Sequence, residues 1–363
     1  MSSILASVRS TLSPEIGLDL GTANTVVYER GAGVMISEPS VVAYDTRSGD
    51  IVAIGHAAKE MEGRAPGRIR VVRPLQRGTI SDFRAAQTLV ARLVDRALAS
   101  RPRLAPRLVA CIPGCATDIE CKAVEQAVRA AGARYTTYVP QALAAAVGAG
   151  LDVLELRAQM IVNIGGGTTE IAIIGTAGII RMSSLQLGGD FFDAAIIAKL
   201  RSQRFLIGAQ TAERLKIELG FAGRAPGNGG ALVNGNDLDA LAPRAREIEE
   251  SIVGEAMAEG VEAIARAVRA VLERTPPDVA ADLIESGITL AGGGALIRGF
   301  AAEIGGRTNV PTVVAPDALT CVARGAGEIL GSPFLLERVR PHADRFTRWY
   351  QSLRIGMRES FSP

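Results

Sequence analysis

The stretch EIGLDLGTANTVVYERGAGVMI, residues 15–36, decides the fold of this chain. Its apolar segments are separated by a turn of small residues, GTAN, and by a glycine turn, GAG, which predicts three consecutive antiparallel strands. A second stretch, MIVNIGGGTTEIAIIGTAGIIR at residues 160–181, follows the same order of strands and turns. Gly165 lies 144 residues after Gly21, and the same offset holds through both turns. The repeat predicts two domains of common design, each opened by such a hairpin.

The composition allows two domains and excludes several classes of protein. The 363 residues are 48% hydrophobic, and 40 basic residues nearly balance 38 acidic ones, so nucleic acid is not the expected ligand. The cysteines form no CxxC pair, and both histidines lie far from them in the sequence, which disfavours a zinc site and fits a reduced, cytoplasmic compartment. No apolar run approaches the roughly 20 residues of a membrane span, and no secretion signal is recognisable.

The segments around the two hairpins predict helices and strands in alternation, which is typical of mixed sheets covered by helices. A capping pattern at Thr117 and Glu120 predicts the start of one helix. Other helices are expected at 82–100, 190–205, 211–219 and 244–274, and strands at 107–112 and 287–290. The last strand leads into a third glycine-rich segment, AGGGALIRGF at residues 291–300.

Both hairpin turns consist of residues that suit a phosphate group. Backbone N–H groups must converge on the anion, and bulky side chains would prevent that approach. The turns at 21–24 and 165–168 would supply such groups from the two domains. Asp19 precedes the first turn and is the expected ligand of Mg²⁺, which prefers one or two carboxylates and keeps most of its waters. Taken singly, each turn could be an ordinary hairpin turn. The matching frames favour a nucleotide.

Two further segments could contact the nucleoside. The loop at 292–296 exposes backbone against which an adenine could lie. Glu213 and Lys216 are three residues apart on a predicted helix and therefore share a face. They could hold the ribose and base, or they could form a solvated salt bridge.

The residues resemble the actin-like ATPases and, within them, the MreB family of bacterial cell-shape proteins. The resemblance extends from about residue 14 to residue 331. It rests on the motifs IGLDLGTANTVVY, SEPSVVAY, GGGTTEIAII, LGGDFFDAAII, LIGAQTAERLKIELG, LAGGGALIRG and LTCVARGAG. It implies an α/β actin-like fold in which two related domains flank an ATP cleft. It also implies filaments at the inner membrane surface that guide cell-wall synthesis, and a cytoplasmic, membrane-peripheral location.

The resemblance also implies the residues of the site. Gln141 and Thr168 are the expected catalytic residues, and Asp19 is the expected metal ligand. The expected nucleotide-binding residues are Thr22, Ala23, Asn24, Gly166, Gly167, Thr168, Glu213, Arg214, Leu215, Lys216, Gly293, Gly294, Ala295 and Leu296.

The chain departs from the family pattern in its acidic residues. Asn163 stands where MreB usually has aspartate, which predicts weaker Mg²⁺ binding. Gln141 stands where MreB usually has its catalytic glutamate. A glutamine can orient the attacking water without acting as a base, so hydrolysis is expected to be slow. Alternatively, Gln141 only opens a helix at 142–149.

Two other segments also differ. Residues 220–245 are shorter than in the family and lack strand signals, which predicts a flexible, reduced upper lobe in the second domain and weakens the case for ordinary polymerisation. Residues 334–363 form a basic amphipathic tail containing Trp349, which could bind a membrane or pack on the protein itself. Residues 1–13 offer a second membrane contact. The expected domains are 14–157 and 158–314, with a return to the first at 315–333.

Three functions remain open from the sequence. The first is a shape-determining, filament-forming ATP-binding protein. The second is a scaffold of the same family that hydrolyses ATP weakly or not at all. The third is a small-molecule kinase or chaperone on the same fold, for which the sequence offers no convincing catalytic carboxylate and no substrate domain.

Overall fold

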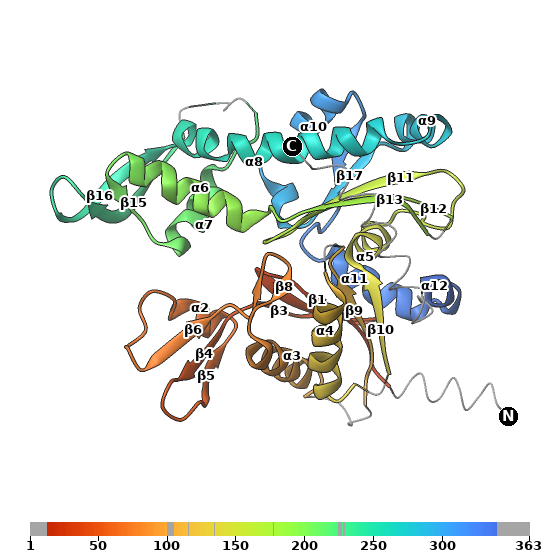
Figure 1. Ribbon diagram of the computed structural model, residues 1–363, viewed down its shortest axis with the longest axis horizontal. Helices are drawn as coiled ribbons and strands as arrows, with labels where there is room; N and C mark the ends of the chain where they lie inside the picture. The colour runs from red at the N-terminus through yellow and green to blue at the C-terminus, as the bar shows by residue number, and fades with distance from the viewer. Residues whose placement is uncertain are drawn as a thin grey trace.

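The computed structural model describes residues 13–99, 105–114, 116–133, 135–176, 178–223, 227 and 229–339. Two α/β halves face each other across the molecule (Figure 1). We call the part up to residue 157, together with residues 315–339, domain I, and residues 158–314 domain II. The two segments considered as membrane contacts lie almost wholly outside the described residues. Within the described ranges, no helix is both long and apolar enough to cross a membrane.

Domain I is built on a five-stranded sheet in the order β10-β9-β1-β2-β3. The hairpin strands are antiparallel, whereas β9 and β10 run parallel to β1 and to each other. The strands are β1 (Glu15–Leu20), β2 (Asn24–Glu29), β3 (Gly33–Pro39), β9 (Arg107–Ile112) and β10 (Tyr135–Pro140).

Domain II repeats this sheet in the equivalent order β18-β17-β11-β12-β13, again with an antiparallel hairpin and two parallel strands. Both hairpins predicted from the repeat are therefore confirmed. The strands are β11 (Gln159–Ile164), β12 (Thr169–Gly175), β13 (Gly178–Leu185), β17 (Ile288–Ala291) and β18 (Thr312–Val314).

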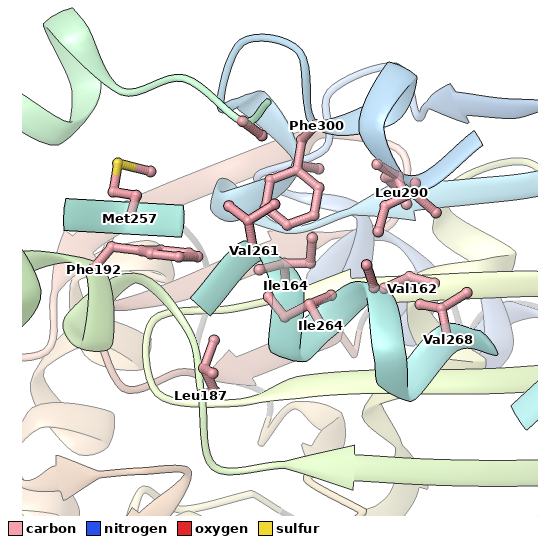
Figure 2. Packing of buried hydrophobic residues seen from close by; sticks show 14 of the residues in the cluster. Val162, Ile164, Leu187, Phe192, Met257, Val261, Ile264, Val268, Leu290 and Phe300 are labelled. Atoms are coloured by element: carbon pink, nitrogen blue, oxygen red, sulfur yellow. The ribbon is translucent and has the colours of Figure 1, made fainter. Parts of the chain in front are cut away.

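Helices cover the outer face of each sheet. In domain I, Asp82 caps α3 (Phe83–Ala97), and the predicted capping box of Thr117 and Glu120 opens α4 (Asp118–Ala130). In domain II, α8 (Glu250–Glu273) packs over strands β12 and β13, and α6 (Gly189–Ser202) packs beside α8. Apolar side chains of α8, among them Val261 and Ile264, lie against β11 and against Phe300 at the start of α10 (Phe300–Thr308) (Figure 2). Burial of these apolar faces stabilises domain II.

Two helices, α5 (Gln141–Gly148) and α11 (Cys321–Gly331), lie between the sheets (Figure 1). They approach so closely that a Cβ atom on Gly148 would collide with the backbone of Cys321, and one on Gly325 with the backbone of Ala144. Glycine at these two positions therefore permits the contact. The buried cluster around them includes residues of both sheets, such as Val109 and Ile161. The helix pair therefore joins the two domains beneath the cleft.

Each domain also carries a small sheet. In domain I its order is β5-β4-β6, formed by β4 (Val42–Asp45), β5 (Ile51–Ile54) and β6 (Ile69–Val72), and in domain II it is β14-β15-β16, where β14 spans Phe205–Leu206. The prediction that residues 220–245 lack strands is wrong, because β15 (Gly230–Asp237) pairs along its length with β16 (Ala242–Glu249). The predicted start of the long helix near residue 244 is also wrong, since β16 occupies that position. Val233 and Ile248 are buried in the domain II core, so tertiary packing supplies what the local sequence does not.

The remaining elements are short or peripheral. They are β4 (Val42–Asp45), β5 (Ile51–Ile54), α2 (His56–Glu60), β6 (Ile69–Val72), β7 (Leu75–Gln76), β8 (Thr79–Ile80), β14 (Phe205–Leu206), α7 (Ala209–Leu219), α9 (Pro277–Ser286), the 3₁₀ turn η1 (Gly293–Leu296), α10 (Phe300–Thr308) and α12 (Pro333–Val339).

Candidate functional site

A cavity of about 310 Å³ lies between the two hairpin turns. This volume is in the range of small-molecule sites. All three glycine-rich segments line the cavity, together with the end of β1, the start of α5 and one face of α7. The predicted residues that line it are Asp19, Thr22, Ala23, Asn24, Gln141, Gly166, Gly167, Thr168, Glu213, Lys216, Gly293, Gly294 and Leu296.

The two hairpin turns approach each other so closely that glycine is needed. A Cβ atom on Gly166 would lie 2.7 Å from the Cβ of Ala23, and one on Gly167 would lie 2.7 Å from the Oγ1 of Thr22. The same hydroxyl accepts a 3.0 Å hydrogen bond from the N–H of Gly78. The turns therefore close over the cavity with little side-chain bulk, as convergence of backbone N–H groups on a phosphate requires.

A buried polar pair forms part of the cavity wall. The Nε2 of Gln141 donates a hydrogen bond to the Oδ1 of Asp19 over 3.0 Å. Burial raises the pKa of Asp19 to about 6, although the bond from Gln141 opposes this increase. Because α5 begins at Gln141, this residue opens the helix and also lines the cavity. The helix-opening role is therefore observed, and the place of Gln141 in the cavity wall leaves the orienting of water as a prediction.

The polar groups at this end of the cavity fit a magnesium ion. The Oδ1 of Asn163 is buried and has no hydrogen-bond partner among the described residues. Asp19 is a desolvated carboxylate that a cation would stabilise. The described part of the chain has no cluster of three or more histidine, cysteine or acidic side chains suited to a metal. Mg²⁺ needs no such cluster, since phosphates and waters supply most of its ligands.

Helix α7 contributes only part of the predicted segment 213–216. Glu213 and Lys216 line the cavity, but both are ion-paired: Lys216 with Asp193 at 2.8 Å and Glu213 with Lys59 at 2.6 Å. The ion pair between Glu213 and Lys59 crosses the cleft from domain II to domain I. The solvated salt bridge between Glu213 and Lys216, which their spacing on one helix allowed, is therefore not formed.

Three predicted binding residues do not line the cavity. Arg214 lies on the outer side of α7, where its guanidinium bonds Glu218 and the backbone carbonyl of Leu232. Leu215 is fully buried in the core of domain II. Ala295 is buried beneath the third glycine loop, whereas its neighbours Gly294 and Leu296 reach the cavity.

The third loop follows β17 and approaches the second hairpin. Gly292 has a φ of +81°, and a Cβ atom there would lie 2.8 Å from the Oδ1 of Asn163. Leu296 is half exposed at the cavity edge. The loop thus provides backbone and one apolar side chain, a combination that suits the flat face of a base.

A family model described as MreB/Mbl protein matches residues 13–337. The chain belongs to the MreB/Mbl family. The cell shape-determining protein MreB of Escherichia coli (strain K12) is 41% identical over 333 residues, covering 90% of this chain and 96% of that protein. The cell shape-determining protein Mbl of Bacillus subtilis (strain 168) is 37% identical over 317 residues, with coverage of 87% and 95%. The crystal structure of MreB 5 of Spiroplasma citri bound to AMPPNP is 33% identical, with a TM-score of 0.81 and coverage of 87% and 96%.

Membership of the MreB/Mbl family confirms the resemblance inferred from the motifs, and the structural match confirms the actin-like fold. The sequence did not reveal two residues near the cleft. Lys59 pairs with Glu213 across it. Glu170 lies fully buried behind the cavity wall. A glutamate within the apolar strand segment TEIAII is the one local signal that could have identified Glu170.

Proposed function

We propose that this MreB/Mbl-family chain binds ATP with Mg²⁺ between its two domains. We further propose that it assembles into filaments at the cytoplasmic face of the cell membrane, where it guides cell shape and cell-wall synthesis. Relatives from Escherichia coli and Bacillus subtilis that are named cell shape-determining proteins support the cellular part. The AMPPNP-bound MreB 5 of Spiroplasma citri supports the nucleotide.

The observation that carries the nucleotide proposal is the close approach of the two glycine turns over the cavity. Gly166 and Ala23 leave no room for a side chain between them, so mainly backbone groups would face the phosphates. Asp19 would hold Mg²⁺, which would neutralise charge on the phosphates. The third glycine loop would lie along the adenine, and Glu213, which lines the cavity, would approach the ribose while keeping its ion pair with Lys59.

Hydrolysis is proposed to be slow. Gln141 would orient the attacking water through its amide, as glutamine does in Ras. Thr168 lies on the opposite turn and would bond the same water or a phosphate oxygen. Asn163 favours a second candidate, a scaffold that binds ATP without useful turnover. Measuring phosphate release by the unmodified chain beside an Asn163→Asp variant separates the two: slow release by the unmodified chain supports the first candidate, whereas release by the variant alone supports the scaffold.

Sedimentation of the full chain tests the assembly proposal. Samples would contain ATP, ADP or no nucleotide, each with and without anionic liposomes. ATP-dependent pelleting that increases with liposomes is expected. A chain that stays monomeric and soluble with ATP and lipid at high protein concentration contradicts the proposed filament.

A further inference from the structure

Glu170 is a buried carboxylate for which the proposed site has no role. It lies on the central strand β12, between β11 and β13, and is fully buried. An ionised carboxylate in such a position is costly unless hydrogen bonds or nearby charges stabilise it. What contacts Glu170 therefore indicates its role.

The contacts of Glu170 come from the other domain. Its Oε1 accepts a hydrogen bond from the backbone N–H of Gly114, and the N–H of Ala142 also stabilises the charged form. Its Oε2 has no hydrogen-bond partner within the described ranges. Gly114 follows Pro113 and Ala142 follows Gln141, and both Pro113 and Gln141 line the cavity. The side chain of Glu170, from domain II, thus contacts two residues of domain I, each of which directly follows a residue that lines the cavity.

The start of α5 lacks a cap from its own segment. Its N-cap residue is Pro140, which makes no side-chain cap bond, and no acidic residue lies in its first turn. Unpaired N–H groups at a helix start favour a carboxylate. The carboxylate of Glu170 lies beside this helix start from across the domain boundary, close enough that the N–H of Ala142, one residue beyond Gln141, lowers the pKa of Glu170 against the larger rise that burial causes.

We propose that Glu170 is a positioning residue, which caps α5 from domain II and thereby fixes Gln141 for hydrolysis when the domains close on ATP. Glu170 acts through Gln141 and does not contact the nucleotide. The inference rests on the proposed binding of ATP and extends it to a specific link between domain closure and the reacting water. Loss of the cap would let the first turn of α5 move, and small displacements of a positioned group cost about 10- to 100-fold in rate.

The test compares Glu170→Gln with Glu250→Gln in the full chain. Glu250 is a second buried carboxylate of domain II, but it pairs with Arg298 away from the cleft. Three quantities are measured: the dissociation constant of ATP, the single-turnover rate of phosphate release, and amide hydrogen exchange over residues 139–148. We expect Glu170→Gln to retain ATP affinity, to slow phosphate release about 10-fold or more and to speed exchange at the start of α5. Glu250→Gln should change neither the rate nor this exchange.

Each other outcome has a definite meaning. Wild-type phosphate release by Glu170→Gln overturns the inference, as does an equal loss of affinity and rate. A wild-type chain that binds ATP but releases no phosphate also overturns it and leaves ATP binding intact, whereas a chain that binds no ATP contradicts both proposals. If Glu170→Gln does not fold, Glu170→Asp is measured instead. It keeps the charge but shortens the reach, and wild-type release by this variant overturns the inference.

Discussion

Gln141 and Asp19 are joined by a 3.0 Å hydrogen bond, although one opens helix α5 and the other lies near the end of strand β1. The residue proposed to orient water and the residue proposed to hold Mg²⁺ therefore form one unit within domain I. The bond also stabilises the charged form of Asp19, whose pKa burial raises to about 6.

Replacing Gln141 by alanine should separate binding from hydrolysis. Gln141→Ala removes the amide proposed to orient the water and leaves the glycine turns intact. We expect the affinity for ATP to change little and single-turnover phosphate release to fall by about 100-fold, a typical loss for a positioned catalytic group. Fluorescent-nucleotide titration and a phosphate-release assay measure the two quantities. Equal rates in the variant and the wild type would remove Gln141 from the mechanism.

Asn163→Asp should strengthen Mg²⁺ binding. The Oδ1 of Asn163, which has no hydrogen-bond partner among the described residues, becomes part of a carboxylate that lines the same cavity as Asp19. A divalent cation stabilises such a pair of carboxylates. Without Mg²⁺, the second buried negative charge should lower the melting temperature, whereas Mg²⁺ and ATP together should raise it more than in the wild type. Asn234→Asp, an exposed change on β15, is the control. An unchanged Mg²⁺ requirement for ATP binding would show that position 163 lies outside the metal site.

The stability of the nucleotide-free chain should depend on Asp19 in a defined pH window. Since burial raises the pKa of Asp19 from 3.8 to about 6, the folded state binds more protons between these values, and the free energy of unfolding falls as pH rises through the window. Asp19→Asn removes this loss. The free energy of unfolding of Asp19→Asn should exceed that of the wild type by an amount that grows with pH, to on the order of 3 kcal/mol above about pH 7. Denaturant unfolding at several pH values measures this difference, with exposed Asp50→Asn as control. A difference in the free energy of unfolding that does not grow with pH contradicts a raised pKa of Asp19 in the folded chain.

The ion pair between Lys59 and Glu213 should retard opening of the cleft. It joins helices α2 and α7 of opposite domains, and both side chains are about three-quarters buried. Lys59→Met should speed ADP dissociation by up to roughly fivefold, because such a partly exposed pair contributes up to about 1 kcal/mol. Stopped-flow displacement measures the rate. Lys199→Met breaks a pair within domain II and should have no effect. A Lys59→Met rate equal to that of the wild type would show that the pair does not hold the cleft.

The repeated hairpins were predictable because their turns depend on local chemistry. Glycine and small residues specify the tight turns at Gly21 and Gly165, and the strands on either side are apolar enough to be recognised. The capping box at Thr117 is equally local and was confirmed. The cavity-lining residues of both turns could therefore be named from the sequence.

The small sheet of domain II could not be predicted in this way. The segments of β15 and β16 are rich in glycine, asparagine, alanine and arginine, and their strand conformation depends on pairing and on buried Val233 and Ile248. The family resemblance implies Arg214 and Leu215 as part of a continuous motif, but a helix turns successive side chains to different faces, and neither residue lines the cavity. Glu170 and Lys59 contact residues of the opposite domain, and no local pattern reveals which residues they meet.

The central claim, that the two glycine turns close on ATP, is tested most directly by calorimetric titration of Gly166→Ala beside the wild type. A Cβ atom at this position would lie 2.7 Å from that of Ala23, so the turns must separate. Gly306→Ala, on helix α10 with open space around the new atom, is the control. We predict one ATP per wild-type chain in the presence of Mg²⁺, unchanged affinity in Gly306→Ala, and affinity at least about 10-fold weaker in Gly166→Ala, equivalent to about 1.4 kcal/mol. Wild-type affinity in Gly166→Ala, or no binding by the wild type, would contradict the account.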